Sequence, residues 1–486
     1  MVPEGVNLSS SDAVAIGAIV VRNDARSDVM AKIENAAVTA LDGNVSVSAT
    51  EDTTIIATTD ATATASGGSA YGTGMVIGAS GIVATNMVLS QADAYLDNSI
   101  VTASDADDLD ADQFGNVIVD AQNTSLIDAT VLNSVTSGDT SAGVTLAFNT
   151  VGWQAQNILF QALDALISTD IGTEQKAGMH AYAFDSTLTA DGDVKVTANS
   201  EAQINADVGN EAAAAAAALY GASSAAISGL LASNMVSSEA DAYIHYTADM
   251  DSNLDVDAGV AVTVQANEKA EISASTRMLA KGSSTNDAGT SLINNFADAL
   301  LTEYHYTTNS GTQKVKPLEM VRLADNYTGG TGAPGVVYMY NGADESNLNL
   351  GNQNYAGNPL WVRFEAVDIV PAFGNISDSN SAAVGGLVVR NDVRGGVDAS
   401  IEKAKIEAAA LNVNALENAT ITAQTLSAAE ASGGSAFGTG TVIAGNGTAA
   451  TNLVLSHADA WVNYSDITTT VGDIKVDARN TSMVLV

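Results

Sequence analysis

The chain has 486 residues, no cysteine and a formal net charge of −38. The lack of thiols excludes disulfides and thiolate metal sites, and the negative charge argues against nucleic acids and anionic membranes as partners, because binding to either relies on clustered Lys and Arg. Hydrophobic residues make up 46% of the sequence but aromatic residues only 5%, so we expect a thin core built mainly of Ala and Val. The most apolar stretch, Ala212 to Ala232, is interrupted by Ser and Gly, and we therefore expect no membrane span.

Residues 1–150 are predicted to form β-strands that recur at a regular interval. Val45, Val47 and Ala49 alternate with polar residues, and the same alternation recurs downstream from Val194 and from Val262. Strict alternation of branched apolar and polar residues is typical of a strand that is buried on one face. We therefore interpret the recurring segments as strand units and not as helical repeats.

One asparagine recurs in each unit and sets its length. Neighbouring asparagines are 63 residues apart in the first units and 61 apart in the last, with longer separations where insertions intervene. Nine residues later, an aromatic or polar residue such as Tyr95 or Tyr243 is expected to begin a strand. The recurrence suggests an asparagine ladder in a turn, with side-chain amides bonded along a stack; alternatively, Asn simply terminates each strand. The ladder positions are Asn23, Asn86, Asn149, Asn234, Asn391 and Asn452.

Two insertions interrupt these units. Residues 151–178 change to helical spacing, with apolar residues recurring on one face, and predict a short amphipathic helix. The strand units resume over residues 179–280. Residues 281–376 then hold a second expected helix, near Leu292, and a small β module with Gly-rich turns.

The expected β module is enriched in aromatic residues. Flat rings with a polar edge suit carbohydrate faces, so these side chains are candidates for stacking on sugars. Alternatively, they form the core of a module that has few other bulky residues. The candidate carbohydrate-binding residues are Tyr338, Tyr340, Tyr355 and Trp361.

Residues 377–486 are a second, shorter copy of the start of the chain. Val20-Val-Arg-Asn-Asp24 recurs as Val388-Val-Arg-Asn-Asp392. Ser66-Gly-Gly-Ser-Ala-Tyr-Gly-Thr-Gly74 recurs with one change as Ser432-Gly-Gly-Ser-Ala-Phe-Gly-Thr-Gly440, 366 residues later. The chain therefore contains a long internal repeat in addition to the shorter units.

Stacking of the units follows from their composition. A 61- to 63-residue unit with small side chains buries too little apolar surface to offset a chain entropy of about 1–2 kcal/mol per residue. Stacked units share one core along the array. We therefore predict an all-β fold, a parallel β-solenoid built from 61- to 63-residue units, with short helical insertions and one small inserted β module.

The sequence carries no motif that points to catalysis. It has no nucleophile elbow, phosphate loop or dinucleotide fingerprint, so we expect no enzyme activity. The four histidines are isolated in the sequence and are expected to be strand or surface residues: His180, His245, His305 and His457.

Two acidic clusters favour calcium as a ligand, because this ion prefers oxygen donors gathered in a turn. The alternative is that both clusters are solvated acidic turns. The candidate metal ligands are Asp105, Asp107, Asp108, Asp110 and Asp112 in the first cluster, and Asp249, Asp251, Asn253 and Asp255 in the second.

The strand units resemble those of the giant repetitive surface proteins of environmental bacteria, including the LEPR-XLL type. The likeness lies in units such as Ala240-Asp-Ala-Tyr-Ile244 followed by Val262-Thr-Val-Gln-Ala266. Leu163-Asp-Ala-Leu-Ile167 with Ile171-Gly-Thr-Glu174, and the module from Val321 to Trp361, are also similar. The LEPR-XLL signature itself does not occur in this chain. The resemblance implies secretion, large size and a structural or adhesive role, and it transfers no catalytic residue.

The sequence therefore predicts an extracellular structural or adhesive protein of the cell surface. Its units are expected to stack, also from chain to chain, so that the protein self-assembles as a homo-oligomer into a fibre, filament or sheath. The alternative is a carbohydrate-binding or polysaccharide-degrading β-helix protein whose partner is a surface polysaccharide. That reading requires acidic and basic residues gathered on adjacent coils, and the 18 basic residues are dispersed.

Overall fold

The structure is a computed structural model in which almost every element is a β-strand. It describes residues 12–66, 75–105, 115–154, 173–217, 221–248, 254–286, 304–324, 327–332, 336–342, 345–363, 375, 378–435 and 439–486. Two short 3₁₀ turns are the only helical elements within these ranges, η1 (Thr308–Ser310) and η2 (Leu350–Asn352). Both helices expected from the sequence fall at residues 155–172 and 287–303, which lie outside the described residues.

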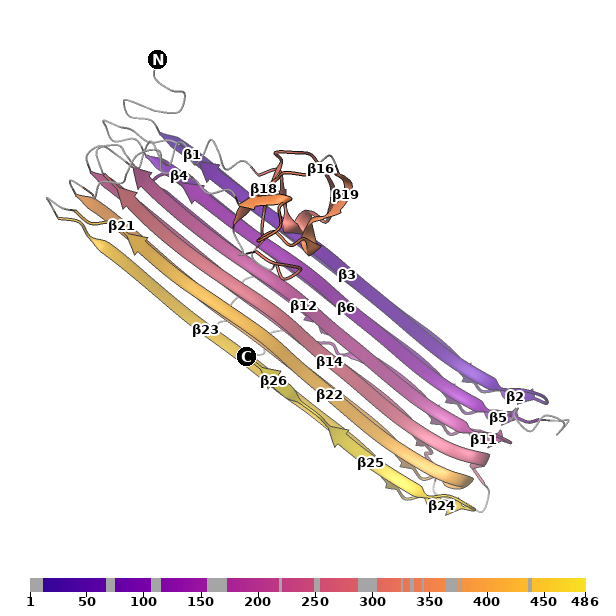
Figure 1. Cartoon of the computed structure of the whole chain (residues 1–486). Coiled ribbons are helices and arrows are strands. Elements are labelled where there is room, and N and C mark those ends of the chain that lie inside the picture. Colours follow the sequence, from indigo (N-terminus) through magenta and orange to yellow (C-terminus); the bar gives the residue numbers. More distant parts are fainter. Residues whose placement is uncertain are drawn as a thin grey trace.

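Two long parallel sheets dominate the molecule, and their strands lie side by side from the indigo to the yellow end of the chain (Figure 1). We call the first sheet A. Its strands follow the order β1-β4-β10-β13-β21-β23, and β7 lies in line with β10, ahead of it, between β4 and β13. The strands of sheet A are β1 (Ala13–Glu34), β4 (Val76–Asp97), β7 (Thr140–Val151), β10 (Ala177–Phe184), β13 (Ala222–His245), β21 (Ser379–Glu402) and β23 (Val442–Asn463).

The second sheet, sheet B, receives the chain after every strand of sheet A except β7, which is followed by β8, β9 and β10. Its longest strands are fully parallel and span up to 30 residues. Its members are β2 (Ala37–Ala40), β3 (Val45–Ala65), β5 (Ile100–Ala103), β6 (Val117–Ser137), β11 (Thr187–Ala190), β12 (Val194–Ala217), β14 (Val256–Thr285), β22 (Lys405–Ser432), β24 (Asp466–Thr469), β25 (Ile474–Asn480) and β26 (Met483–Leu485). Two such sheets, traversed in turn, give a stack consistent with a parallel β-solenoid.

Apolar and polar residues alternate in the sequence because buried and outward-facing positions alternate along each strand. In β6, Val117, Val119 and Ala121 are buried, while Ile118, Asp120 and Gln122, which follow them in turn, face outward. The inner side chains of the two sheets form common apolar clusters, one of which joins Leu96 of sheet A to residues of sheet B. The core is therefore one layer thick and consists largely of Ala, Val and Ile, as the scarcity of aromatic residues predicts.

Polar residues also form a row inside this core. Five residues occupy the same register position on neighbouring strands of sheet B: Glu51, Asn123, Ser200, Glu268 and Glu417. The carboxylate of Glu268 accepts hydrogen bonds from the Ser238 hydroxyl and, at 2.8 Å, from the Gly396 N–H. Burial, together with the neighbouring Glu417, raises the pKa of Glu268 well above its usual range.

The turn from sheet A to sheet B requires a left-handed backbone. Asn35, Asn98 and Asp185 occupy this position with φ of 51°, 46° and 46°, a conformation that Asn and Asp tolerate better than most residues. The Asn98 amide also donates to the side-chain oxygen of Asn35 at 2.5 Å. A turn asparagine pair thus exists, but it is not the recurring asparagine that the sequence singled out.

The inserted module has its own small core, and it contains a sheet in the order β15-β17-β18-β20 and the pair β16-β19. Its strands are β15 (Tyr306–Thr307), β16 (Thr312–Val315), β17 (Met320–Arg322), β18 (Val337–Tyr340), β19 (Glu345–Asn349) and β20 (Trp361–Arg363). A further antiparallel pair, β8 (Trp153–Gln154) and β9 (Thr173–Glu174), flanks residues 155–172.

The apolar stretch from Ala212 to Ala232 belongs to the end of β12 and the start of β13. Within the described residues there is no helix with the length and apolar character that a bilayer crossing needs.

Candidate functional site

The outer face of sheet A carries a row of ionisable side chains, one on each of five neighbouring strands. Parallel pairing without register shifts places these residues directly opposite one another, about 4.8 Å apart from strand to strand. We call them the acidic row: Asp93 on β4, His180 on β10, Asp241 on β13, Asp398 on β21 and Asp459 on β23.

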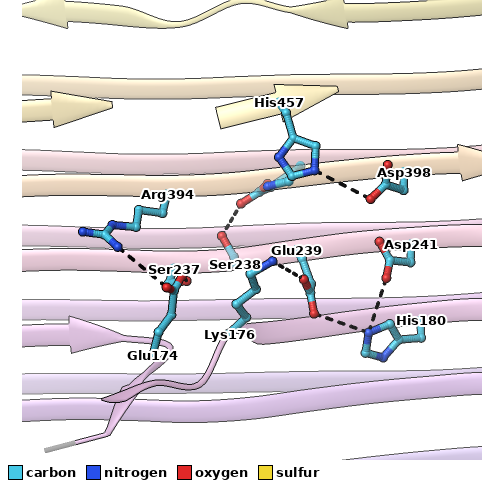
Figure 2. A network of polar contacts seen from close by, with 12 residues as sticks. Glu174, Lys176, His180, Ser237, Ser238, Glu239, Asp241, Arg394, Asp398 and His457 are labelled. Atoms are coloured by element: carbon cyan, nitrogen blue, oxygen red, sulfur yellow. Dashed lines mark hydrogen bonds and ion pairs between the residues drawn. The ribbon is translucent and has the colours of Figure 1, made fainter. Parts of the chain in front are cut away.

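His180 lies at the centre of the best-defined cluster in this row. Its Nδ1 is 2.8 Å from Asp93 Oδ1, and its Nε2 is 3.6 Å from Glu239 Oε1 and 3.6 Å from Asp241 Oδ2. The other oxygen of Glu239 is 2.6 Å from the ammonium of Lys176. Figure 2 shows the imidazole of His180 facing Glu239 and Asp241, with Lys176 on the other side of Glu239.

The surrounding carboxylates determine the protonation of this cluster. Burial alone would lower the pKa of His180, but the hydrogen bonds and charges of Asp93, Glu239 and Asp241 outweigh it and raise this pKa to about 10. The close approach of the His180 imidazole, together with Lys176, lowers the pKa of Glu239 to about 2. Burial raises the pKa of Asp241 to about 6, and the nearby Glu239 and Asp398 carboxylates act in the same direction. The three carboxylates of the cluster therefore carry more negative charge than the two cations, His180 and Lys176, neutralise.

A glycine gives the imidazole of His180 its position. Gly178 precedes His180 on the same face of β10, and a Cβ at this residue would lie 2.9 Å from His180 Cε1. Any larger residue would push the ring away from the Glu239 carboxylate, which lies 3.6 Å from the same Cβ position.

A second cluster repeats this arrangement at the edge of the sheet. Asp398, His457 and Asp459 also bring their ligand atoms within 4.8 Å of one another, and His457 Nε2 lies 3.6 Å from Asp398 Oδ2. The His457 side chain is 50% exposed, compared with 23% for His180. Among the described residues, no carboxylate lies against the Nδ1 of His457 as Asp93 does against that of His180.

An aromatic row runs beside the acidic row, two residues further along each strand. Tyr95, Tyr182 and Tyr243 stack with ring centroids 4.7 Å apart and with interplanar angles of 3° and 5°. Ser400 occupies the next strand, and Trp461 follows on β23. The ring faces of the three tyrosines are turned towards one another, and the Tyr95 hydroxyl lies 3.7 Å from Met30 Sδ.

The six recurring asparagines form one continuous chain of hydrogen bonds. Each side-chain amide donates to the oxygen of the next asparagine, at 2.7 or 2.8 Å throughout. Four of these residues are at most 2% exposed: Asn86, Asn149, Asn234 and Asn391.

The expected position of these asparagines was wrong. They lie within the strands of sheet A and face the core, not in a turn; Asn149 is two residues from the end of β7, and the others are further from the ends of their strands. Neighbouring parallel strands hold equivalent side chains about 4.8 Å apart, so amides bond along a strand stack as well as along a turn. Tyr95 and Tyr243, which were expected to begin strands, lie near the ends of β4 and β13, because each follows by nine residues an asparagine that is inside the strand.

Most of the predicted calcium ligands lie outside the described residues, namely Asp107, Asp108, Asp110, Asp112, Asp249, Asp251 and Asn253. The described ones, Asp105 and Asp255, take part in turns. Asp105 forms a bridge with Asp42 and donates its backbone N–H to Asp191. The carboxylate of Asp255 accepts the backbone N–H of Lys405 at 2.8 Å. Calcium binding by these clusters stays a prediction.

The candidate sugar-binding residues are not surface residues. Tyr338, Tyr340, Tyr355 and Trp361 are between 0 and 4% exposed and pack together in the core of the inserted module. Of the two alternatives that the sequence left open, the structure shows the second, in which these rings fill the interior of a module that has few other bulky residues.

Sequence reasoning missed the His180 cluster. Its members are far apart in the sequence, and the histidines were judged by local spacing alone. A usable signal was present: the seventh residue after Asn86, Asn234, Asn391 and Asn452 is Asp in every case. Aligning the units on the asparagine would have revealed the acidic row. The other two histidines bond elsewhere, His245 to Ser400 Oγ at 2.8 Å and His305 to the backbone of the module.

Comparisons of the chain with protein-family models, with curated proteins and with solved structures find no match.

Proposed function

We propose that this protein is a non-enzymatic structural or adhesive component of an extracellular surface, built as a flat ribbon of stacked coils. The single observation that carries the proposal is the continuity of the stack: sheet A pairs strand to strand without a register shift from β1 to β23. Such a body offers broad flat faces and a uniform interior, which suit a load-bearing layer.

The dimensions favour a wall over a spacer arm. A 24-residue strand such as β21 spans about 75 Å, whereas each further strand adds only about 4.8 Å along the stack. Ala13 pairs with Val76, so one coil takes 63 residues. A coil therefore uses many residues for each step of about 4.8 Å by which it lengthens the stack. It is an effective way to gain width, and we infer that the 61- to 63-residue unit is one coil of a wide ribbon.

Hydrogen bonds and ring stacking from coil to coil would make this ribbon stiff. The asparagine chain crosses six strands of sheet A, and the stacked Tyr95, Tyr182 and Tyr243 cross three on the outer face. Both link equivalent residues of successive coils, so bending or sliding one coil against the next breaks contacts of both kinds. Adhesion or assembly through a broad face requires this rigidity.

The edges of the stack provide a means of growth. Val14, Ile16 and Val20 on β1 are exposed at one edge, and Val442 and Ile443 on β23 at the other. Unpaired strand edges accept further strands, whether from more coils of one polypeptide or from another copy. We propose that this pairing extends the ribbon into a fibre or sheath.

Electron microscopy of the purified chain at increasing concentration tests this function, in calcium and again with chelator. We expect flat ribbons whose width matches one strand length, growing with concentration; loss of order on chelation would assign the stiffening to calcium in the acidic turns. Globular particles without extended flat faces would overturn the proposal.

A second candidate function is carbohydrate binding at the outer face of sheet A. The specific observation in its favour is the acidic row beside the tyrosine hydroxyls, because carboxylates and hydroxyls are groups that bond sugar hydroxyls. The stacked ring faces argue against it, since they are occupied by one another. Co-sedimentation with acidic and neutral polysaccharides, together with assays for depolymerisation, distinguishes the two: binding abolished by Tyr243→Ala would favour this candidate.

A further inference from the structure

We propose that His180 Nε2, Glu239 Oε1 and Asp241 Oδ2 form a binding site for a divalent transition metal of the zinc class. One nitrogen and two carboxylate oxygens are a ligand set that Zn²⁺ uses in proteins, with water filling the open position. The inference is independent of the proposed structural role, because it concerns three side chains on two strands and not the assembly of the ribbon.

The distances in the cluster match a metal site better than a hydrogen-bonded one. Nε2 of His180 stands 3.6 Å from one oxygen of Glu239 and 3.6 Å from one of Asp241. Hydrogen bonds between nitrogen and oxygen fall at about 2.7–3.2 Å, so neither contact is a good one. Ligand atoms about 2.0–2.2 Å from a tetrahedral zinc ion lie about 3.4 Å from each other. The distances from His180 Nε2 to the two carboxylate oxygens are therefore close to the distance between two ligand atoms of one zinc ion.

The groups behind these ligands hold them in the orientation that a metal requires. Asp93 lies 2.8 Å from Nδ1 of His180 and can accept its proton, which leaves Nε2 as the metal-binding nitrogen. A carboxylate behind a histidine is the usual second partner at zinc sites. Lys176 binds Oε2 of Glu239 at 2.6 Å, so Oε1 is left for the ion. Gly178 provides the space into which the ring leans.

The charge of the site also favours a cation. Asp241 has Asp398 directly opposite on β21, and in-register neighbours of like charge repel each other. An ion bound between Glu239 and Asp241 would relieve this repulsion. Binding replaces the proton on Nε2 and releases it to solvent, while the proton on Nδ1 stays in the hydrogen bond to Asp93. The bound ion would then join β10 to β13.

The test uses the full chain without a histidine tag, with Co²⁺ as a spectroscopic probe and Zn²⁺ as a competitor. We expect visible absorption bands of a histidine-bound, low-coordinate Co²⁺, which stoichiometric Zn²⁺ abolishes. His180→Ala and Glu239→Gln should remove the bands. Asp93→Asn should keep them but weaken Zn²⁺ binding about 10- to 100-fold, because it removes only the orienting carboxylate.

His457→Ala is the matched control, since it removes the histidine of the exposed cluster that lacks an orienting carboxylate. Circular dichroism establishes that each variant is folded. Bands unchanged by His457→Ala and lost with His180→Ala support the site. The proposal is overturned if the folded His180→Ala chain gives the same spectrum and Zn²⁺ affinity as the parent chain, or if the parent chain does not bind Zn²⁺ even at millimolar concentration.

Discussion

Replacement of Asn234 by Ala tests the asparagine chain at its most buried point. Asn234 is 0% exposed; its oxygen accepts from Asn149 and its amide donates to Asn391, both at 2.8 Å. The substitution leaves one donor and one acceptor without partners inside the core. Each orphaned buried group costs about 1–3 kcal/mol, so we expect the free energy of opening of β13 to fall by about 2–6 kcal/mol.

The matched control is Asn23→Ala at the edge of the stack. Asn23 makes only one ladder hydrogen bond, to Asn86, and it is partly exposed. Water can replace part of what is lost there, so we expect a cost of about 1 kcal/mol.

The assay is native-state hydrogen exchange of peptides that cover residues 222–245, supported by urea unfolding, because long repeat arrays need not unfold in one step. Faster exchange should be centred on the altered strand and its two neighbours. If Asn234→Ala and Asn23→Ala cost the same, the reasoning that buried amides stabilise the stack is refuted.

Two further predictions concern the core and a turn. Burial, with Glu417 beside it, raises the pKa of Glu268. As pH rises above the usual glutamate range, the unfolded chain therefore loses a proton that the folded chain keeps. The free energy of unfolding then falls by about 1.4 kcal/mol for each pH unit until Glu268 ionises in the folded chain as well. Glu268→Gln should therefore flatten the decline of the urea midpoint as pH rises above the usual glutamate range, and parallel declines would count against it. Gly152 and Gly221 have φ of 75° and 69°, but a Cβ at Gly152 would lie 1.9 Å from the Ser237 carbonyl oxygen whereas Gly221 faces open space. Gly221→Ala should cost about 1 kcal/mol and Gly152→Ala considerably more; equal thermal midpoints for the two variants would contradict this.

The recurrence of residues along this sequence was enough to identify equivalent positions. A stack of coils places equivalent residues on neighbouring strands, so the asparagine series and the alternation from Val45 onward follow directly from the sequence. The recurrence does not say where in a coil a position lies. Asn86 and Gly81 are turn-forming types, yet both lie within β4, because a strand with neighbours on both sides satisfies their backbone groups.

The candidate site was harder to predict, for a different reason. His180 reaches the acidic row because β10 resumes the register of β4 after residues 155–172, and no local spacing reveals that alignment. The two alternatives for the aromatic residues of the module stayed open because composition alone does not separate a buried Tyr355 from an exposed one. Pairing between distant strands determines both outcomes.

The central claim is that the coils run straight along strands that reach more than twenty residues, as in β21, and one distance tests it. The chain has no cysteine, so spin labels can be attached to cysteines introduced at Val384 and Glu402, which lie on the outer face of β21. Eighteen residues of extended strand separate them by about 60 Å. Pulsed electron paramagnetic resonance should give a narrow distribution near that distance. A distribution centred well below it would mean that the coil folds back on itself, and would contradict the wide ribbon on which the proposed function depends.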